Sequence, residues 1–186
     1  GMVTLQLALD APDLVRSLVV ANSPADVRLH TWHDVWFYLS RRLAVQMLGM
    51  RRVGRLLAGR LFPRDDQESL RETFVERWAA NDEQAYVGAV ASIMGWSVQG
   101  WVSDIEPPAV IVISAHDCAP VSVKNQMVAE MPTARLAVVP GARHALPVEK
   151  PEAFNALVSE FLADVHDPGE NEAPVSAPEE VAPSAR

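Results

Sequence analysis

The stretch that decides the fold runs from Pro108 to Val121 and reads PAVIVISAHDCAPV. Residues 109–114 are apolar up to the closing serine, which is typical of a strand covered on both faces in a parallel sheet. Asp117 follows three residues after that strand ends. An aspartate in such a place is often only a turn former, so its position alone assigns no role.

A second strand and loop lie just downstream, in RLAVVPGARHALPVEKPEAFN, residues 135–155. Residues 136–139 predict a strand, and His144 lies in the loop that follows it. Ligand sites of open α/β sheets lie outside the carboxyl ends of the strands, so Asp117 and His144 are expected on neighbouring loops at one edge. A carboxylate there can accept the imidazole Nδ1–H, which leaves the other ring nitrogen free to take a proton. We therefore interpret the pair as a candidate acid and base.

Working outward, the remaining sequence alternates strands and helices around a long helical insertion. Residues 2–10, 121–130 and 151–162 predict helices, and residues 17–21 predict a strand. The insertion predicts helices over 31–50 with a continuation over 51–61, over 65–81 capped by Asp65 and Asp66, and over 82–98 capped by Asp82. The expected fold class is α/β, a partial doubly wound parallel sheet with a helical cap insertion. The expected parts are the start of the core (1–25), a helical cap or lid (26–106), the C-terminal core (107–165) and a disordered acidic tail (166–186).

The bulk composition narrows the possible functions. About half of the residues are apolar (49%), which allows a buried core, and the net charge is −8. With that charge and no basic aromatic surface, a nucleic-acid partner is not expected. Cys118 is the one cysteine, which excludes an internal disulfide and multi-cysteine zinc sites. No apolar run is long enough to cross a bilayer, so a membrane-spanning segment is not expected. We expect a cytoplasmic protein, and we expect no cofactor. The oligomeric state stays open.

Other side chains are weaker candidates. Cys118 lacks an elbow turn or a helix N-terminus and is interpreted as a packing residue, and Ser23 lies in a turn without elbow glycines. The histidines outside the candidate pair (His30, His33 and His116) show no ligand spacing, so no metal site is expected. Arginines between residues 41 and 64 form a run without acidic residues. We interpret this run as a solvated face of the lid in preference to a membrane-binding surface or a site for an anionic substrate. The aromatic stripe of the insertion is a candidate lining of an apolar substrate pocket, although packing explains it equally well. That stripe consists of Trp32, Trp36 and Phe37.

Three segments resemble the α/β-hydrolase family. The segment 108–121 resembles its acid-bearing strand and loop, residues 135–155 resemble its histidine loop and final helix, and residues 1–22 resemble the helix and strand after its nucleophile elbow. The resemblance implies that Asp117 is the acid, His144 the base and Gly1 a glycine just after the nucleophile, which would precede Gly1 by two or three residues. The family's first five strands and both oxyanion donors are expected to precede this chain as well. Ser114 departs from the family, which usually has glycine there.

The resemblance implies a hydrolase that acts on an ester, lactone or related acyl bond of a small apolar substrate by Ser-His-Asp catalysis. A haloalkane dehalogenase, a carbon–carbon bond hydrolase and a non-catalytic binding relative remain alternatives. Without a nucleophile and an oxyanion hole, the 186-residue polypeptide is expected to have no esterase activity. We also expect it to be poorly soluble, because the sheet would expose an apolar edge.

Overall fold

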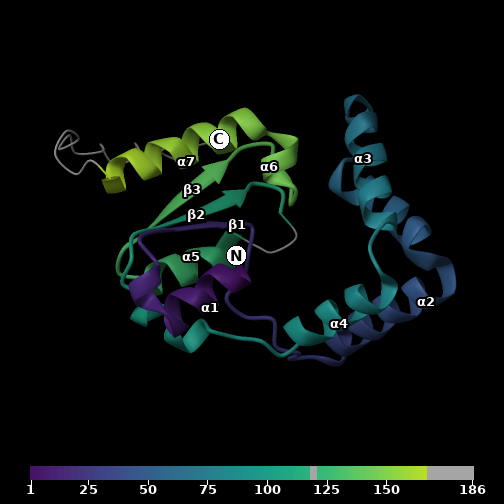
Figure 1. Cartoon of the computed structure of the whole chain (residues 1–186), viewed down its shortest axis with the longest axis horizontal. Coiled ribbons are helices and arrows are strands. Elements are labelled where there is room, and N and C mark those ends of the chain that lie inside the picture. The colour runs from purple at the N-terminus through teal and green to yellow at the C-terminus, as the bar shows by residue number, and fades with distance from the viewer. Residues whose placement is uncertain (118–120, 167–186) are drawn as a thin grey trace, which may run out of the picture.

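The computed structural model describes residues 1–117 and 121–166. Three strands form one parallel sheet in the order β1-β2-β3: Leu18–Ala21, Ala109–Ser114 and Ala134–Val139. Helices α1 (Met2–Asp10) and α5 (Val121–Glu130) lie on one face, and α6 (Leu146–Glu149) and α7 (Pro151–His166) on the other (Figure 1). The expected α/β class, a partial parallel sheet, is therefore present.

The central strand explains why the sheet needs helices on both faces. All six residues of β2 are buried. Ile111 and Ile113 belong to the cluster formed with α1 and α5, whereas Val110 and Val112 belong to the cluster formed with α6 and α7. This alternation follows the two-residue period of a strand, and each fully buried branched side chain contributes about 1.5–3 kcal/mol. The strand is thus held by two separate apolar clusters.

The inserted helices lie beside the sheet and form a third, smaller apolar cluster (Figure 1). They are α2 (Trp32–Leu61), α3 (Glu68–Ala79) and α4 (Glu83–Ile93). The helix α2 begins at a Thr31 capping box and is kinked at Gly49, whose φ of 74° is left-handed. Trp78 of α3 stacks on Phe74 at 5.3 Å between ring centroids, and the Cα of Gly54 on α2 lies against its indole ring. An added Cβ at Gly54 would lie 2.9 Å from Trp78 Cδ1, so the two helices pack through a glycine.

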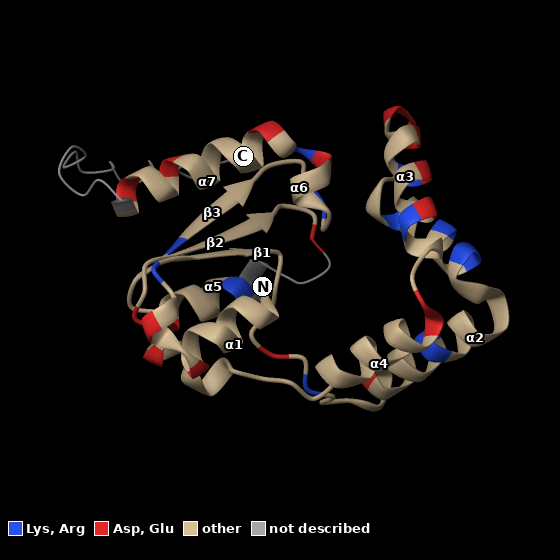
Figure 2. Cartoon of the chain, viewed as in Figure 1, with Lys and Arg blue, Asp and Glu red and all other residues tan. Residues whose placement is uncertain are grey.

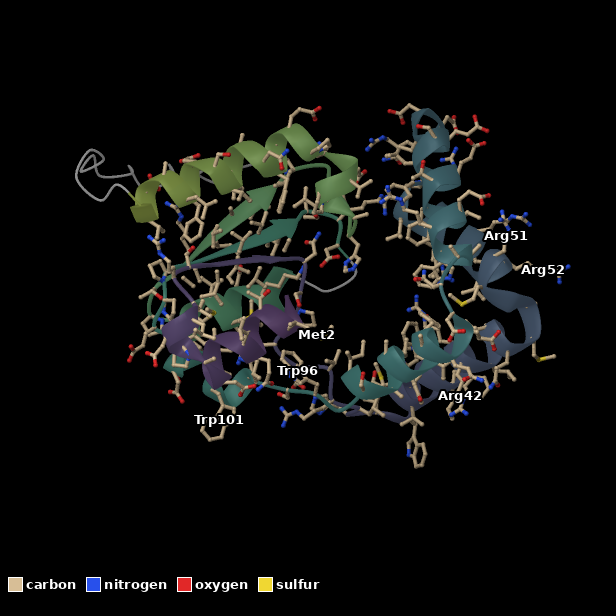
Figure 3. All side chains as sticks on the ribbon, viewed as in Figure 1. Met2, Arg42, Arg51, Arg52, Trp96 and Trp101 are labelled. Atoms are coloured by element: carbon tan, nitrogen blue, oxygen red, sulfur yellow. The ribbon has the colours of Figure 1, made fainter. Side chains whose placement is uncertain are left out.

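The chain leaves and re-enters the core at one place. Asp26 and Ser97 form an isolated antiparallel bridge, and the Val98 N–H donates to the Ala25 carbonyl at 2.8 Å. Hydrogen bonds from the Arg28 side chain are the main reason that the pKa of Asp26 lies well below its ordinary value, and the Arg28 backbone and His30 lower it further. Trp96 Nε1 donates to Gln6 on α1, and Figure 3 shows that indole beside the start of α1. The insertion is therefore anchored by its two ends.

Several helix and strand boundaries differ from the sequence predictions. Residues 65–67 form a 3₁₀ turn in which Gln67 Oε1 accepts the Arg64 N–H, so Asp65 and Asp66 do not cap α3. Asp82 does cap α4, but α4 ends at Ile93 because Gly95 takes a φ of 88°. The strand β3 begins two residues earlier than predicted, and α7 extends beyond Leu162. The short helix α6 was not predicted, and the predicted disordered tail lies outside the described residues except for His166, which ends α7.

Candidate functional site

Asp117 and His144 lie on neighbouring loops at the carboxyl edge of the sheet and touch. Asp117 follows β2, and its N–H donates to the Ser114 carbonyl at 3.2 Å. His144 follows β3, and its Nδ1 lies 2.7 Å from Asp117 Oδ1. The Asp117 side chain is 2% exposed and that of His144 51%, so the carboxylate is enclosed while the ring reaches solvent. With Nδ1–H donated to Asp117, Nε2 is the nitrogen available to a reacting group.

A third side chain contacts this pair and was missed by the sequence analysis. Lys124 of α5 donates from Nζ to Asp117 Oδ2, and its side chain is 1% exposed. A buried carboxylate is stabilised when its charge is compensated at close range, and here an ammonium does so on one oxygen while the imidazole occupies the other. Nothing in the pattern of α5 indicates this contact, because it depends on how that helix packs against β2.

The backbone of the histidine loop is held by a buried amide from the end of β1. Asn22 Nδ2 donates to the carbonyls of Arg143 (3.2 Å) and His144 (3.0 Å) and to Ser114 Oγ (2.8 Å), while its Oδ1 accepts the Ser114 N–H at 2.8 Å. Ser114 Oγ in turn donates to the Arg143 carbonyl at 2.7 Å. Asn22 and Ser114 are 5% and 0% exposed. The Ser114 side chain therefore supports the histidine loop together with Asn22.

Asn22 also explains a strained backbone position. Its φ is 47°, the left-handed region that asparagine tolerates better than most residues. Ser23 follows, and the start of α1 packs on it so closely that a Cβ on Gly1 would lie 2.2 Å from Ser23 Cβ. The first turn of α1 thus starts against Ser23, which directly follows Asn22, the residue that holds the His144 carbonyl. Ser23 Oγ donates to the Pro24 carbonyl at 3.5 Å, and Cys118 lies outside the described residues.

A cavity separates the histidine loop from the inserted helices. It has a volume of 380 Å³, and Ala145 and Val148 form the wall that comes from the histidine loop and α6. The opposite wall comes mostly from α3 and the turn before it, and consists of Phe62, Leu70, Thr73, Phe74, Arg77, Trp78 and Asn81. The cavity is mostly apolar with a few polar groups, which is the usual character of a site for a small molecule.

The predicted aromatic stripe does not line this cavity. Trp32, Trp36 and Phe37 lie at the start of α2 and are 88%, 68% and 49% exposed. None of the three is among the residues that line the 380 Å³ cavity. The aromatic wall comes instead from α3, whose phenylalanine and tryptophan were not singled out from the sequence. Their spacing of four residues was the available signal, and it reads equally well as ordinary packing.

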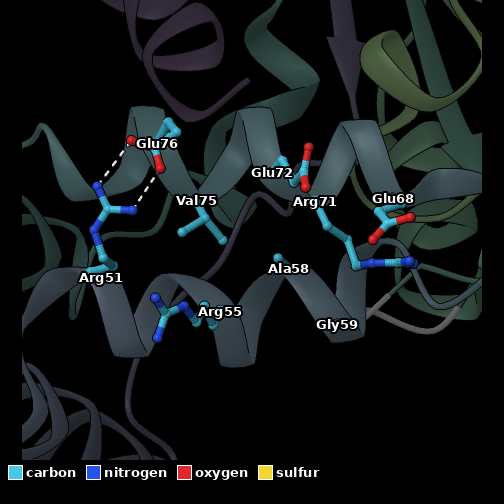
Figure 4. A pocket seen from close by; sticks show the side chains of 9 residues that line it. All are labelled: Arg51, Arg55, Ala58, Gly59, Glu68, Arg71, Glu72, Val75 and Glu76. Carbon is cyan, nitrogen blue, oxygen red and sulfur yellow. Dashed lines mark hydrogen bonds and ion pairs between the residues drawn. The ribbon is translucent and has the colours of Figure 1, made fainter.

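A second groove lies within the insertion itself, between α2 and α3 (Figure 4). It has a volume of 530 Å³ and an apolar floor that includes Ala58 and Val75. Arg51 donates two hydrogen bonds, of 2.6 and 2.9 Å, to the Glu76 carboxylate across its end. Figure 2 shows basic residues of α2 alongside acidic residues of α3, and Figure 3 shows Arg52 pointing away from the molecule. Part of the arginine run is thus paired with α3.

His30, His33 and His116 lie within residues 1–117 and 121–166, the part of the chain that the structure describes. Within that part, no group of three or more His, Cys, Asp or Glu side chains could hold a metal ion. His30 Nε2 contacts Asp26 Oδ2 at 3.3 Å, and the His116 N–H donates to the Ala142 carbonyl. Within the same residues, no helix combines the length and the apolar character that spanning a membrane requires.

Comparison with known proteins gives structural neighbours but no sequence family. No protein-family model matches the chain. The structure is similar to an enol-lactonase from Burkholderia xenovorans LB400 (20% identity, TM-score 0.76) and to a hydrolase from Pseudomonas aeruginosa PA01 (27%, 0.74). It is also similar to a thermophilic esterase from Thermogutta terrifontis (17%, 0.76). The matches cover 88%, 87% and 89% of this chain but only 62%, 61% and 62% of those proteins, so the chain spans about three fifths of their length.

Proposed function

We propose that this chain, which carries the C-terminal part of the α/β-hydrolase fold shared by these structures, supplies the acid and the base of a hydrolase. The bond broken would be an ester, a lactone or a related acyl bond of a small apolar substrate. The observation that carries the proposal is the 2.7 Å contact between Asp117 Oδ1 and His144 Nδ1 at the carboxyl edge of the sheet. The enol-lactonase and esterase activities named for two neighbours agree with it.

In this proposal His144 is the general base. It takes the proton of a nucleophile through Nε2 and later returns it to the leaving group. Asp117 holds the ring in the required tautomer and stabilises the imidazolium that forms. The buried position of Asp117 supports this role, because an enclosed carboxylate interacts more strongly with a nearby charge than one in water.

The nucleophile of this proposal is a serine from a segment that precedes Gly1. Two observations support that source: the chain spans about three fifths of its neighbours, and Gly1 packs against Ser23, next to the asparagine that holds the His144 carbonyl. A group attached just before Gly1 would therefore enter the site at the carboxyl edge. The same preceding segment would supply the hydrogen-bond donors to the carbonyl oxygen of the substrate.

The inserted helices serve as the cap of the proposed enzyme. The 380 Å³ cavity between α3 and the loop that carries Ala145, the residue after His144, is the proposed substrate pocket. Its apolar lining suits a small apolar acyl or alcohol group, and a closed cap would exclude water from the reacting bond. Trp32, Trp36 and Phe37 would contact the substrate only after a movement of the cap, because these residues are 88%, 68% and 49% exposed.

The test is an esterase assay on the protein expressed from its full natural coding sequence, with p-nitrophenyl butyrate as substrate. We expect His144→Ala and Asp117→Asn to lower kcat about 10³-fold or more. His116→Ala is the matched control, because His116 is exposed and lies beside the acid without a proposed role, and it should keep near wild-type activity. Wild-type turnover that survives His144→Ala would refute the proposal.

The same coding sequence separates the alternatives. A Gly-x-Ser-x motif directly before Gly1 agrees with the esterase. An aspartate in the serine position would favour a haloalkane dehalogenase. The absence of both serine and aspartate at that position would favour a non-catalytic binding protein. A carbon–carbon bond hydrolase would keep the serine but prefer a diketone to the ester, which parallel assays of both substrates distinguish.

A further inference from the structure

Glu149 is a buried acid that the proposed chemistry does not use. It is the last residue of α6, and its side chain is 0% exposed. Three donors satisfy its carboxylate: the Arg143 N–H at 2.6 Å, Gln67 Nε2 at 2.9 Å and Arg64 Nη1 at 3.1 Å. A fully enclosed carboxylate is tolerated only with such charge-assisted bonds, so its partners cannot leave without cost.

The three donors come from two distant parts of the chain. Arg143 precedes His144 in the histidine loop, whereas Arg64 and Gln67 lie in the turn between α2 and α3. Gln67 is itself 2% exposed, and its Oε1 accepts the Arg64 N–H at 3.1 Å. That turn is therefore organised around the carboxylate: Arg64 and Gln67 donate to Oε1, whereas the Arg143 N–H donates to Oε2. A shift of the turn would pull on the carboxylate that holds the Arg143 N–H.

The peptide around Arg143 is thereby fixed from both sides. Its N–H is held by Glu149, and its carbonyl and that of His144 are held by Asn22. Two hydrogen bonds join helices α2–α4 and their connecting turns to the rest of the described chain, apart from local bonds at the two ends of the insertion. Both of them reach Glu149. The contact also flanks the 380 Å³ cavity, since Val148 and Phe62 line it.

We propose that Glu149 is a positioning residue that couples the inserted helices to His144, so that the imidazole is correctly placed only when the 64–67 turn is docked. This inference rests on the proposed function, because it assigns the coupling to the proposed base. Binding of a substrate in the cavity would press on α3 and on the 64–67 turn. The buried carboxylate would carry that displacement to the histidine loop.

The test uses the protein from its full natural coding sequence and compares Glu149→Gln, Gln67→Met and the double variant. Glu152→Gln is the matched control, an exposed glutamate one turn further along the chain. We expect kcat for p-nitrophenyl butyrate to fall about 10- to 100-fold in Glu149→Gln, because a small misplacement of a catalytic group has effects of that size. Gln67→Met should lower kcat several-fold with a smaller change in KM, and the double variant should be no worse than Glu149→Gln alone.

A second readout is independent of turnover. In ¹H–¹⁵N spectra, Gln67→Met should move the amide signals of Arg143 and His144, while Glu152→Gln should not. Unchanged Arg143 and His144 signals together with an unchanged kcat in Gln67→Met would overturn the proposal. If Glu149→Gln fails to fold, Gln67→Met still decides it. If the wild type has no esterase activity, the proposed function fails, whereas the amide shifts still show whether the link exists.

Discussion

Replacing Asn22 tests how the histidine loop is held. The side chain joins β1 to β2 through Ser114 and to the loop through the carbonyls of Arg143 and His144, all in a buried setting. We expect Asn22→Gly to destabilise the protein strongly, although glycine suits the left-handed φ of 47°. Asn22→Ala should be worse, because alanine loses the same hydrogen bonds and does not suit that φ.

The magnitude follows from counting the bonds. The two hydrogens of Nδ2 serve three acceptors, and Oδ1 accepts one bond, so about three full hydrogen bonds are lost at about 1 kcal/mol each. Glycine adds about 0.5–1 kcal/mol of backbone entropy, giving about 3–4 kcal/mol for Asn22→Gly. The left-handed strain of alanine costs about 1–2 kcal/mol, so Asn22→Ala should lose about 0.5–1 kcal/mol more than the glycine variant. The corresponding fall in Tm is about 6–15 °C.

Urea denaturation followed by circular dichroism at 222 nm measures both differences, with the m-value checking that the transition stays two-state. An Asn22→Gly variant within about 1 kcal/mol of wild type would refute the counting, since one net bond is worth about that much. Equal stability of the glycine and alanine variants would instead refute the strain at this position. The pair therefore separates the amide from the backbone conformation.

Three further predictions concern charge and packing. Lys124→Met should lower the free energy of unfolding by about 3–5 kcal/mol, because the Asp117 carboxylate loses its buried ammonium partner. Adding Asp117→Asn should recover part of that loss, and strictly additive effects on the urea midpoint would contradict this coupling. Gly54→Ala should cost about 1–3 kcal/mol, since its Cβ would meet an indole ring at 2.9 Å, whereas Gly59→Ala, with open space around it, should gain about 0.5–1 kcal/mol in the same thermal melts. Asp26→Asn should lower the free energy of unfolding by about 0.5–1 kcal/mol at pH 7. Because the pKa of Asp26 is lowered in the folded state, this difference between variant and wild type should be full above about pH 4 and should shrink as the pH falls below it. A difference that stays constant from about pH 3 to 7 would disprove the ion pair.

The order of elements followed from local patterns. The apolar run of β2 predicted a strand covered on both faces, and helices α1 and α5 begin and end at the predicted residues. The contact between Asp117 and His144 was also predictable, because both follow neighbouring parallel strands and such loops share one edge. Local sequence suffices for these features because each depends on periodicity or on the position of a residue relative to a strand end.

Boundaries that depend on long-range contacts were predicted less well. The end of α4 was placed at Val98, yet the Val98 N–H bonds to Ala25, more than seventy residues away, after a left-handed turn at Gly95. The caps assigned to Asp65 and Asp66 were wrong because Gln67, held by Glu149, organises that turn instead. In both cases a partner distant in sequence decides between local alternatives.

The sequence alone determined the class of the fold, the edge of the sheet where the acid and the histidine meet, and the presence of a helical insertion. Tertiary structure alone decided that Lys124 reaches Asp117, that Asn22 holds the histidine loop and that Glu149 joins this loop to the insertion. The physical reason is that periodicity reports which face of an element is buried, whereas a buried polar side chain is identified only by the partner that satisfies it. Those partners here lie between 6 and 122 residues apart along the chain.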